Sequence, residues 1–230
     1  MRGLSIFNNR KTDMETLAIP QKLAAIGIVP VLVLEQLDDG LRMCDTLISA
    51  GLPVAEITFR TQAAPTILQA ARKRHPEMLL GAGTILDVQS LRRAFDGGAD
   101  FAVAPGYHPA VAAEAQQQGW FFVPGVCTPT EMEAAWSAGF RLLKFYPAEA
   151  MGGANTLKAM AAPYRHLGVR YMPTGGITPK NMEAYLSMPE VACVGGTWMG
   201  PPKDIAAGRW DGIAQGAREA AAAVRAIRAR

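Results

Sequence analysis

Lys144 interrupts an apolar run, residues 142–147, where it lies between Leu143 and Phe145. A β-strand of this composition would place the lysine inside a fold. Burial disfavours the charged ammonium and favours the neutral amine, a nucleophile that condenses with a ketone to form a Schiff base. On this run alone the simpler interpretation is a lysine at a strand end, whose stem is buried while its ammonium reaches water. The rest of the chain favours the first interpretation.

A second candidate strand, residues 54–61, carries a carboxylate and a guanidinium on one face. Successive side chains of a strand point to opposite faces, so Glu56, Thr58 and Arg60 lie together, and the apolar face is free to pack on helices. We expect Glu56 inside the fold and Arg60 above it at the mouth. A buried carboxylate can take up and release protons near neutral pH, and an arginine can hold a carboxylate or a phosphate by two hydrogen bonds. For this strand alone, a structural Glu56–Arg60 ion pair is an equally good interpretation.

The same alternation places Leu142, Lys144 and Tyr146 on one face of the Lys144 strand. If that face is also interior, Lys144 and Glu56 approach each other in one apolar cavity and form a proton-transfer pair. The alternative is a salt bridge kept for stability, which is the weaker interpretation because buried ion pairs rarely stabilise a fold. Titratable groups in a cavity more often mark a functional site.

These two strands belong to a regular alternation of apolar and helix-like segments. The expected strands are Ile28–Val33, Val54–Phe59, Met78–Gly83, Phe101–Ala104, Phe121–Pro124, Leu142–Tyr146, Arg170–Thr174 and Val191–Gly195. The expected helices are Asp38–Ala50, Ala63–Arg74, Asp87–Phe95, Pro109–Gln118, Pro129–Ser137, Ala154–Met160, Pro179–Ser187 and Asp211–Arg228. Most helices begin at Asp or Pro and several end near Gly, as capping chemistry favours.

Eight strands alternating with helices predict an α/β fold, the (β/α)8 TIM barrel, as a single domain over residues 1–230. A doubly wound open sheet of this length would have fewer strands, and a GxGxxG turn would follow its first strand. Before the barrel, residues 1–11 are expected to fray. An N-terminal helix is expected from Thr12, which forms a capping box with Glu15, and Pro20 either breaks this helix or restarts it.

In such a barrel the active site lies at the carboxyl ends of the strands, so the residues that follow each strand are candidates. The third strand ends at Gly83-Thr84, where the glycine allows close approach and Thr84 offers a hydroxyl. Pro105 follows the fourth strand and forms a rigid wall. Gly-Gly turns follow the last two strands, where barrels commonly bind phosphate, and ordinary turn glycines are the alternative. These turns contain Thr174, Gly175, Gly176, Gly195, Gly196 and Thr197.

Composition excludes several classes of function. The chain is 50% hydrophobic and 19% charged, with a net charge of +3, and no Lys/Arg stripe interleaved with aromatic residues indicates a nucleic-acid partner. Its three cysteines are far apart and form no CxxC pair, which argues against disulfides and zinc and fits a reducing cytosol. We find neither a signal peptide nor a run of about 20 apolar residues, so we expect a soluble, cytoplasmic protein without membrane contact.

Taken together, these motifs resemble those of the 2-keto-3-deoxy-6-phosphogluconate (KDPG) aldolases, which double as 4-hydroxy-2-oxoglutarate (KHG) aldolases. The resemblance covers roughly residues 20–205 and follows the order of the strands. Its motifs are Val54-Ala55-Glu56-Ile57-Thr58-Phe59-Arg60-Thr61, Gly81-Ala82-Gly83-Thr84-Ile85, Lys144-Phe145-Tyr146-Pro147-Ala148-Glu149, Pro173-Thr174-Gly175-Gly176-Ile177 and Gly195-Gly196-Thr197-Trp198.

The resemblance implies a class I aldolase on a TIM barrel, a homotrimer that needs neither a metal nor another cofactor. It implies that Lys144 forms the Schiff base and that Glu56 is the general acid and base. Arg60 and Thr84 would hold the pyruvate carboxylate, with Pro105 and Tyr146 beside them. The phosphate end would be lined by Thr174, Gly175, Gly176, Gly195, Gly196 and Thr197.

Two positions depart from the family pattern. Position 197 is usually Ser and is Thr here, and position 146 is usually Phe and is Tyr here. These departures do not affect the chemistry that the resemblance implies, which is reversible cleavage of KDPG to pyruvate and glyceraldehyde 3-phosphate, and cleavage of KHG to pyruvate and glyoxylate. It leaves the galactonate epimer of KDPG open as the preferred substrate. A phosphosugar isomerase or synthase, or a non-catalytic phosphosugar-binding module, remains an alternative that would not need Lys144 as a nucleophile.

Overall fold

The computed structural model of the chain describes residues 13–229, and describes side chains from residue 19 onward. Its strands are β1 (Ile28–Leu32), β2 (Val54–Thr58), β3 (Leu79–Gly83), β4 (Phe101–Val103), β5 (Phe122–Val123), β6 (Gly125–Val126), β7 (Leu142–Phe145), β8 (Arg170–Pro173) and β9 (Val194–Gly196). Its helices are α1 (Asp13–Ile26), α2 (Leu37–Ser49), α3 (Ala64–Arg74), α4 (Val88–Asp96), α5 (Pro109–Gln118), α6 (Pro129–Ser137), α7 (Gly153–Ala161), the 3-10 helix η1 (Ala162–Leu167), α8 (Met182–Leu186), α9 (Pro202–Ala206) and α10 (Trp210–Arg228).

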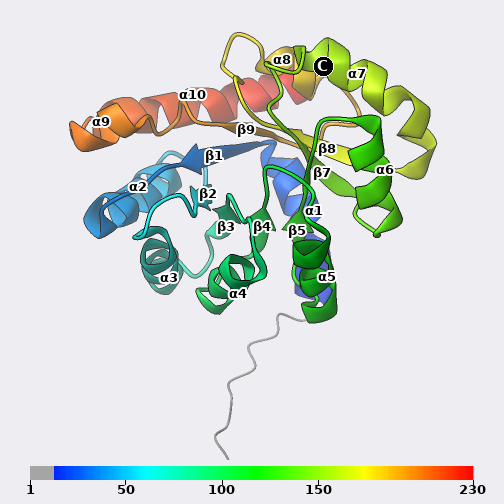
Figure 1. Cartoon of the computed structure of the whole chain (residues 1–230). Helices are drawn as coiled ribbons and strands as arrows, with labels where there is room; N and C mark the ends of the chain where they lie inside the picture. The colour runs from blue at the N-terminus through cyan, green and yellow to red at the C-terminus, as the bar shows by residue number, and fades with distance from the viewer. Residues whose placement is uncertain (1–12, 230) are drawn as a thin grey trace, which may run out of the picture.

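The strands form two parallel sheets that complete one barrel. Six strands pair in the order β5-β4-β3-β2-β1-β9, and three pair in the order β6-β7-β8. Isolated bridges between Thr174 and Gly195 and between Tyr171 and Val191 join the chain at β8 to the chain at and just before β9, while Pro124 alone separates β5 from β6. The helices lie outside the strands, and strands that are distant in the sequence face each other across the interior (Figure 1). The (β/α)8 barrel predicted from the alternation of segments is confirmed.

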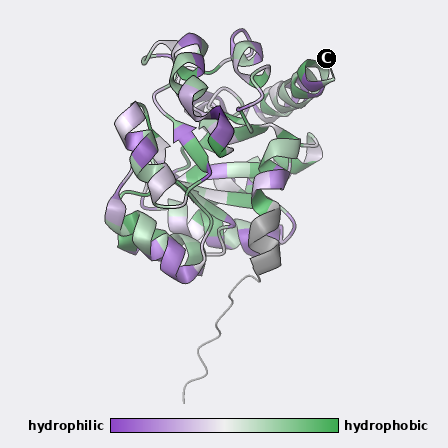
Figure 2. Cartoon of the chain, turned by 90° about the vertical axis from the view of Figure 1, so that its right-hand side faces the viewer, coloured by the Kyte–Doolittle hydropathy of each residue, from purple (hydrophilic) through white to green (hydrophobic). Residues whose placement is uncertain are grey.

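Hydropathy follows this architecture. Figure 2 shows the central strands coloured mostly hydrophobic, whereas the outer helices carry most of the hydrophilic colour. On β2, Ala55 and Ile57 are fully buried against the helices, as period-two alternation predicts. Polar residues are rare in the interior, and the few buried ones include Glu56, Thr58 and Lys144. The barrel therefore buries these three polar side chains in a largely apolar core.

Short capping motifs fix where helices begin after the strands. At α6, Glu131 Oε2 accepts hydrogen bonds from the backbone N–H groups of Cys127 at 2.8 Å and of Thr128 at 3.0 Å. The Thr128 hydroxyl in turn accepts the Glu131 N–H, which completes a capping box. At α4, Asp87 accepts the Ser90 N–H at 2.6 Å. These caps position the loops that rim the carboxyl ends of the strands.

Several boundaries differ from the expectation. Helix α1 continues through Pro20, because buried Ile19 and Leu23 anchor it on both sides of the proline. The fifth expected strand, Phe121–Pro124, is shorter, as β5, and a second short strand, β6, follows Pro124, which lacks the N–H that a continuous ladder needs. The helix expected from Pro179 begins only at Met182. The segments η1 and α9 were not expected, and the helix cap expected at Thr12 and the fraying expected for residues 1–11 lie outside the described residues.

No helix in the described part of the chain is long and apolar enough to cross a membrane.

Candidate active site

A cavity of about 340 Å³ opens at the carboxyl ends of the strands. All of the site residues predicted from the sequence line it except Gly196. They are Glu56, Arg60, Thr84, Pro105, Lys144, Tyr146, Thr174, Gly175, Gly176, Gly195 and Thr197. The cavity therefore gathers residues from most of the barrel strands, at the end of the barrel where the chemistry was expected.

Lys144 and Glu56 meet at the inner end of this cavity. The Lys144 Nζ atom lies 3.3 Å from Glu56 Oε1, and the two side chains are 6% and 1% exposed. The lysine head therefore does not reach bulk water, and the strand-end interpretation of this residue is wrong for the described structure. Among the described residues Glu56 pairs with Lys144 and not with Arg60, which is exposed at the mouth.

The pair is arranged so that one carboxylate oxygen stays available. Glu56 Oε2 is buried and has no hydrogen-bond partner among the described residues. A buried acceptor without a partner is unfavourable, and native proteins keep such groups mainly where function needs them. Gly83 makes room for this carboxylate, since a Cβ atom at that position would lie 2.2 Å from Glu56 Oε1. An amine, a carboxylate with a free oxygen and a small cavity can together perform proton transfer on a bound molecule.

Two further cavity residues have notable positions. The Tyr146 ring centroid lies 5.5 Å from Lys144 Nζ, and the tyrosine is 38% exposed towards the mouth. Thr84 lies in the left-handed region with φ of 60°, which is a rare conformation for a β-branched residue. Such strain is often found at functional sites, where the surrounding structure imposes it.

Backbone turns that follow β8 and β9 build another part of the cavity wall. Gly175 and Gly176 have φ values of 99° and 81°, a conformation that glycine adopts without strain. Gly195 makes room for Thr174, because a Cβ atom there would lie 2.4 Å from the Thr174 hydroxyl oxygen. Gly196 does not line the cavity, and the space beside it is filled by the Trp198 ring. The place of Gly196 at the phosphate end stays a prediction, and packing against the tryptophan explains why a glycine is found at this position.

Four residues of the cavity were missing from the predicted site: Val31, Thr58, Leu86 and Ile177. Thr58 lies on the interior face of its strand between Glu56 and Arg60, so alternation alone could have included it. Leu86 is 56% exposed at the rim, and no pattern in the sequence marks it.

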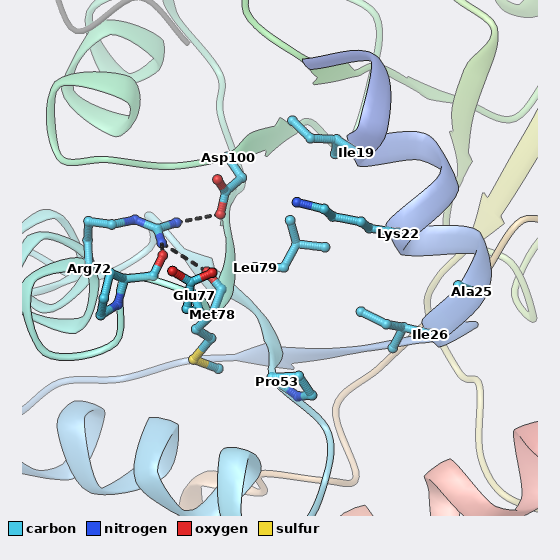
Figure 3. Close-up of a pocket in the computed structure, with 11 residues that line it drawn as sticks. Ile19, Lys22, Ala25, Ile26, Pro53, Arg72, Glu77, Met78, Leu79 and Asp100 are labelled. Carbon is cyan, nitrogen blue, oxygen red and sulfur yellow. Dashed lines mark hydrogen bonds and ion pairs between the residues drawn. The ribbon is translucent and has the colours of Figure 1, made fainter. Parts of the chain in front are cut away.

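A larger cavity, of about 600 Å³, lies at the opposite end of the strands, beside α1 (Figure 3). Its lining includes Pro53, Leu79 and Asp100, which precede or begin β2, β3 and β4. Its arginine is fully engaged, because Arg72 donates to the Met78 carbonyl at 3.0 Å and pairs with Asp100. These contacts tie α3 to the starts of the strands, which is a structural role. The smaller cavity is therefore the candidate active site.

Comparisons with known proteins point to one family. The family described as "Aldolase: KDPG and KHG aldolase" matches residues 19–216. The chain is 41% identical to the 2-dehydro-3-deoxy-phosphogluconate aldolase of Haemophilus influenzae over 89% of this chain and 95% of that protein. It is 37% identical to the KHG/KDPG aldolase of Escherichia coli K12 over 92% of this chain and 96% of that protein.

A solved structure shows the same barrel. The crystal structure of KDPG aldolase from Legionella pneumophila, with pyruvate captured as a covalent carbinolamine intermediate, matches with a TM-score of 0.83 and 34% identity. The match covers 87% of this chain and 97% of that one. A carbinolamine is the adduct of an amine and a ketone, which is the chemistry that a buried lysine amine supports.

Proposed function

The chain belongs to the KDPG and KHG aldolase family, and on that premise we propose how its cavity carries out the cleavage. As a member of this family it is an aldolase, a lyase that cleaves KDPG reversibly to pyruvate and glyceraldehyde 3-phosphate. The observation that carries the assignment of roles is the pair of Lys144 Nζ and Glu56 Oε1, 3.3 Å apart in a nearly inaccessible position. Lys144 is the Schiff-base nucleophile and Glu56 is the general acid and base.

The reaction begins with attack of the neutral Lys144 amine on the C2 ketone. Glu56 delivers a proton to the former ketone oxygen, water leaves, and a protonated imine remains. The C3–C4 bond then breaks, its electron pair moves towards the imine to form an enamine, and Glu56 accepts the proton of the C4 hydroxyl directly or through a water. Glyceraldehyde 3-phosphate leaves. Protonation of the enamine at C3 and hydrolysis of the imine release pyruvate and restore the lysine.

The free Glu56 Oε2 supports this cycle of proton transfers. Oε1 faces the amine, and Oε2 has no other partner among the described residues, so the carboxylate can serve the lysine and the substrate in turn. Arg60 and Thr84 hold the pyruvate carboxylate, because a guanidinium at the mouth forms two parallel hydrogen bonds to a carboxylate. Pro105 and Tyr146 close this end of the cavity.

The part of the cavity built from the turns after β8 and β9 takes the phosphate. Backbone turns that contain glycine let main-chain N–H groups approach an anion, and the last two strands of such barrels commonly provide them. Thr174 and Thr197 add hydroxyl groups, and all of the proposed phosphate-end residues except Gly196 line the cavity.

The galactonate epimer and KHG are further candidate substrates of the same chemistry. Thr197 lines the cavity with a methyl group in addition to its hydroxyl, and Tyr146 adds a phenol beside the lysine. Thr197 lies at the proposed phosphate end, and Tyr146 lies at the pyruvate end with its ring next to Gly175, so the two side chains lie on either side of the position proposed for C4. We also propose that the chain acts as a cytoplasmic homotrimer and that residues 1–230 form a single domain, on the strength of family membership.

The test is release of pyruvate from KDPG and from its galactonate epimer, measured side by side in EDTA. We expect cleavage of KDPG at full rate in the chelator. Assay of Thr197→Ser and Tyr146→Phe on both compounds shows which of the two side chains is responsible for any cleavage of the galactonate epimer. Failure to release pyruvate from either compound would contradict the proposed function.

A further inference from the structure

We propose that Glu149, held by Tyr185, is a positioning residue that fixes the Gly175–Gly176 turn and so determines how tightly the phosphate end of the substrate is bound. The inference rests on the proposed function and extends it to residues outside the cavity. Neither Glu149 nor Tyr185 lines the cavity, so neither touches substrate. Their effect on binding must pass through the turn that they contact.

The carboxylate of Glu149 is anchored on a fully buried tyrosine. Tyr185, on α8, donates its hydroxyl to Glu149 Oε1, and its ring is 0% exposed. Burial and this hydrogen bond raise the pKa of Tyr185, so the phenol stays protonated and remains a donor at all physiological pH values. Glu149 follows β7 in the sequence, so the hydrogen bond ties the end of the Lys144 strand to α8.

The backbone and the aliphatic stem of Glu149 contact the Gly175–Gly176 turn directly. Its backbone N–H donates to the Gly175 carbonyl at 3.0 Å, and the preceding Ala148 N–H donates to the Thr174 carbonyl at 2.8 Å. Its aliphatic stem packs against Gly176, where an added Cβ atom would lie 2.6 Å from Glu149 Cβ and 2.7 Å from Cγ. Rotation of the Glu149 side chain about its Cα–Cβ bond, away from Tyr185, would therefore move Cγ away from Gly176 and leave only Cβ in contact.

Asn181 holds the same turn from its other side. Its Nδ2 donates to the Gly176 carbonyl at 3.0 Å, while its Oδ1 accepts the Thr178 N–H at 2.7 Å. These bonds form the tight connection that delays the start of α8 to Met182. Glu149 and Asn181 thus both hold the Gly175–Gly176 turn by hydrogen bonds.

The two consecutive glycines of the turn explain why these outside contacts are needed. Glycine loses more conformational freedom on ordering than any other residue, so a Gly-Gly turn without external contacts samples many backbone conformations. A site whose donors must be ordered at the moment of binding loses affinity compared with one that is already ordered. Pre-ordering by Glu149 and Tyr185 therefore strengthens binding of the phosphate and leaves the lysine end unaffected.

The test compares Tyr185→Phe with a matched control, Tyr164→Phe. The first variant deletes the hydroxyl and keeps the ring in the core. The second deletes another tyrosine–glutamate hydrogen bond, from the half-buried Tyr164 to Glu133 at 2.7 Å, which lies on the surface away from the cavity. Each variant is assayed for KM and kcat on KDPG, for inhibition by inorganic phosphate, and for the rate of borohydride trapping with pyruvate alone.

We expect Tyr185→Phe to raise KM for KDPG about fivefold, the factor that one hydrogen bond of ordinary strength represents, and to weaken phosphate inhibition. Trapping of pyruvate, which fills only the lysine end, should stay within about twofold of wild type. Glu149→Ala should reproduce this pattern, and Glu149→Gln, which keeps an acceptor oxygen, should retain most of the affinity. Because Glu149 is an exposed residue, its variants serve even if Tyr185→Phe folds poorly.

Equal losses in KDPG cleavage and in pyruvate trapping would overturn the inference, because they would indicate general damage to the barrel. An unchanged KM in both Tyr185→Phe and Glu149→Ala would overturn it as well. Either result, obtained with wild type that cleaves KDPG, leaves the proposed function intact. Only wild type that fails to cleave KDPG would remove the proposed function itself.

Discussion

Lys144 and Glu56 are 88 residues apart in the sequence, yet the barrel holds Nζ and Oε1 at 3.3 Å. They lie on β7 and β2, which are on opposite sides of the ring of strands, so only closure of the sheet brings them together. Both side chains are almost completely buried, 6% exposed for Lys144 and 1% for Glu56. The pairing therefore couples a nucleophile to a proton carrier through the fold itself.

Replacement of Glu56 by glutamine should reduce kcat strongly with little change in stability. Glutamine keeps the shape that fits beside Gly83 but cannot carry a proton between steps. General acid–base catalysis is typically worth about 10²–10⁴-fold, and we expect a loss in that range. Steady-state cleavage of KDPG, with thermal unfolding as a check on the fold, measures it. Activity of Glu56→Gln within a few-fold of wild type would remove Glu56 from the mechanism.

Gly83→Ala should impair catalysis by displacing the carboxylate. The new Cβ atom would lie 2.2 Å from Glu56 Oε1 and 2.8 Å from Cδ, so the glutamate must move. A displacement of about 1 Å can reduce the rate about 10²-fold. The matched control is Gly216→Ala on α10, where a Cβ atom meets nothing within 4 Å. The control should keep wild-type kcat and raise the free energy of unfolding by about 0.5–1 kcal/mol, since alanine favours the helix.

Thr84→Asn should move stability and activity in opposite directions. The φ of 60° at Thr84 is strained for a β-branched residue, whereas asparagine tolerates it. Relief of this strain should raise the free energy of unfolding by about 1 kcal/mol. Loss of the threonine hydroxyl beside the proposed carboxylate site should raise KM for KDPG. Denaturant titration and steady-state kinetics on one preparation measure both effects, and a drop in stability would show that the backbone there is not strained.

The three cysteines should differ in reactivity towards a thiol reagent at pH 8. Burial raises the pKa of Cys44 to about 12 and that of Cys193 to about 12, so neither forms thiolate in the folded protein at that pH. Cys127 is half-buried and should react first. Titration should therefore give one fast thiol in the native protein and three after denaturation. Rapid native labelling of Cys44 or Cys193 would contradict this prediction.

The same two thiols predict how stability changes with pH. In the unfolded chain a cysteine has a pKa of about 8.5, well below the folded value. Between about pH 9 and pH 12 the unfolded state therefore releases protons that the folded state keeps. The free energy of unfolding should fall as the pH rises through this range. Urea titrations at successive alkaline pH values, with Cys44→Ala as the comparison, measure this contribution.

The sequence predicted the barrel well because its signals are local. Alternation along residues 54–61 and 142–147 determines which side chains face inward, and the interior face is polar only at a few positions. Family motifs then pointed to residues that line the cavity, and Gly196, which they also include, lies beside the Trp198 ring. Such signals depend on a few neighbouring residues, so they are readable without coordinates.

What could not be predicted depends on contacts between distant segments. The continuation of α1 through Pro20 comes from packing that outweighs helix propensity. The left-handed backbone at Thr84 is imposed by its surroundings, since threonine does not favour it. The hydrogen bond between Glu149 and Tyr185 joins residues that are 36 positions apart in the sequence, and no sequence motif predicts it.

The most direct test of the proposed mechanism is reduction by borohydride in the presence of pyruvate, followed by peptide mapping. We expect one reduced pyruvyl group per chain, attached to Lys144 alone, because the imine forms only at the amine beside Glu56. Lys144→Met should carry no such group and should be nearly inactive. Labelling of a different lysine, or trapping of pyruvate by Lys144→Met at the wild-type rate, would contradict the central claim.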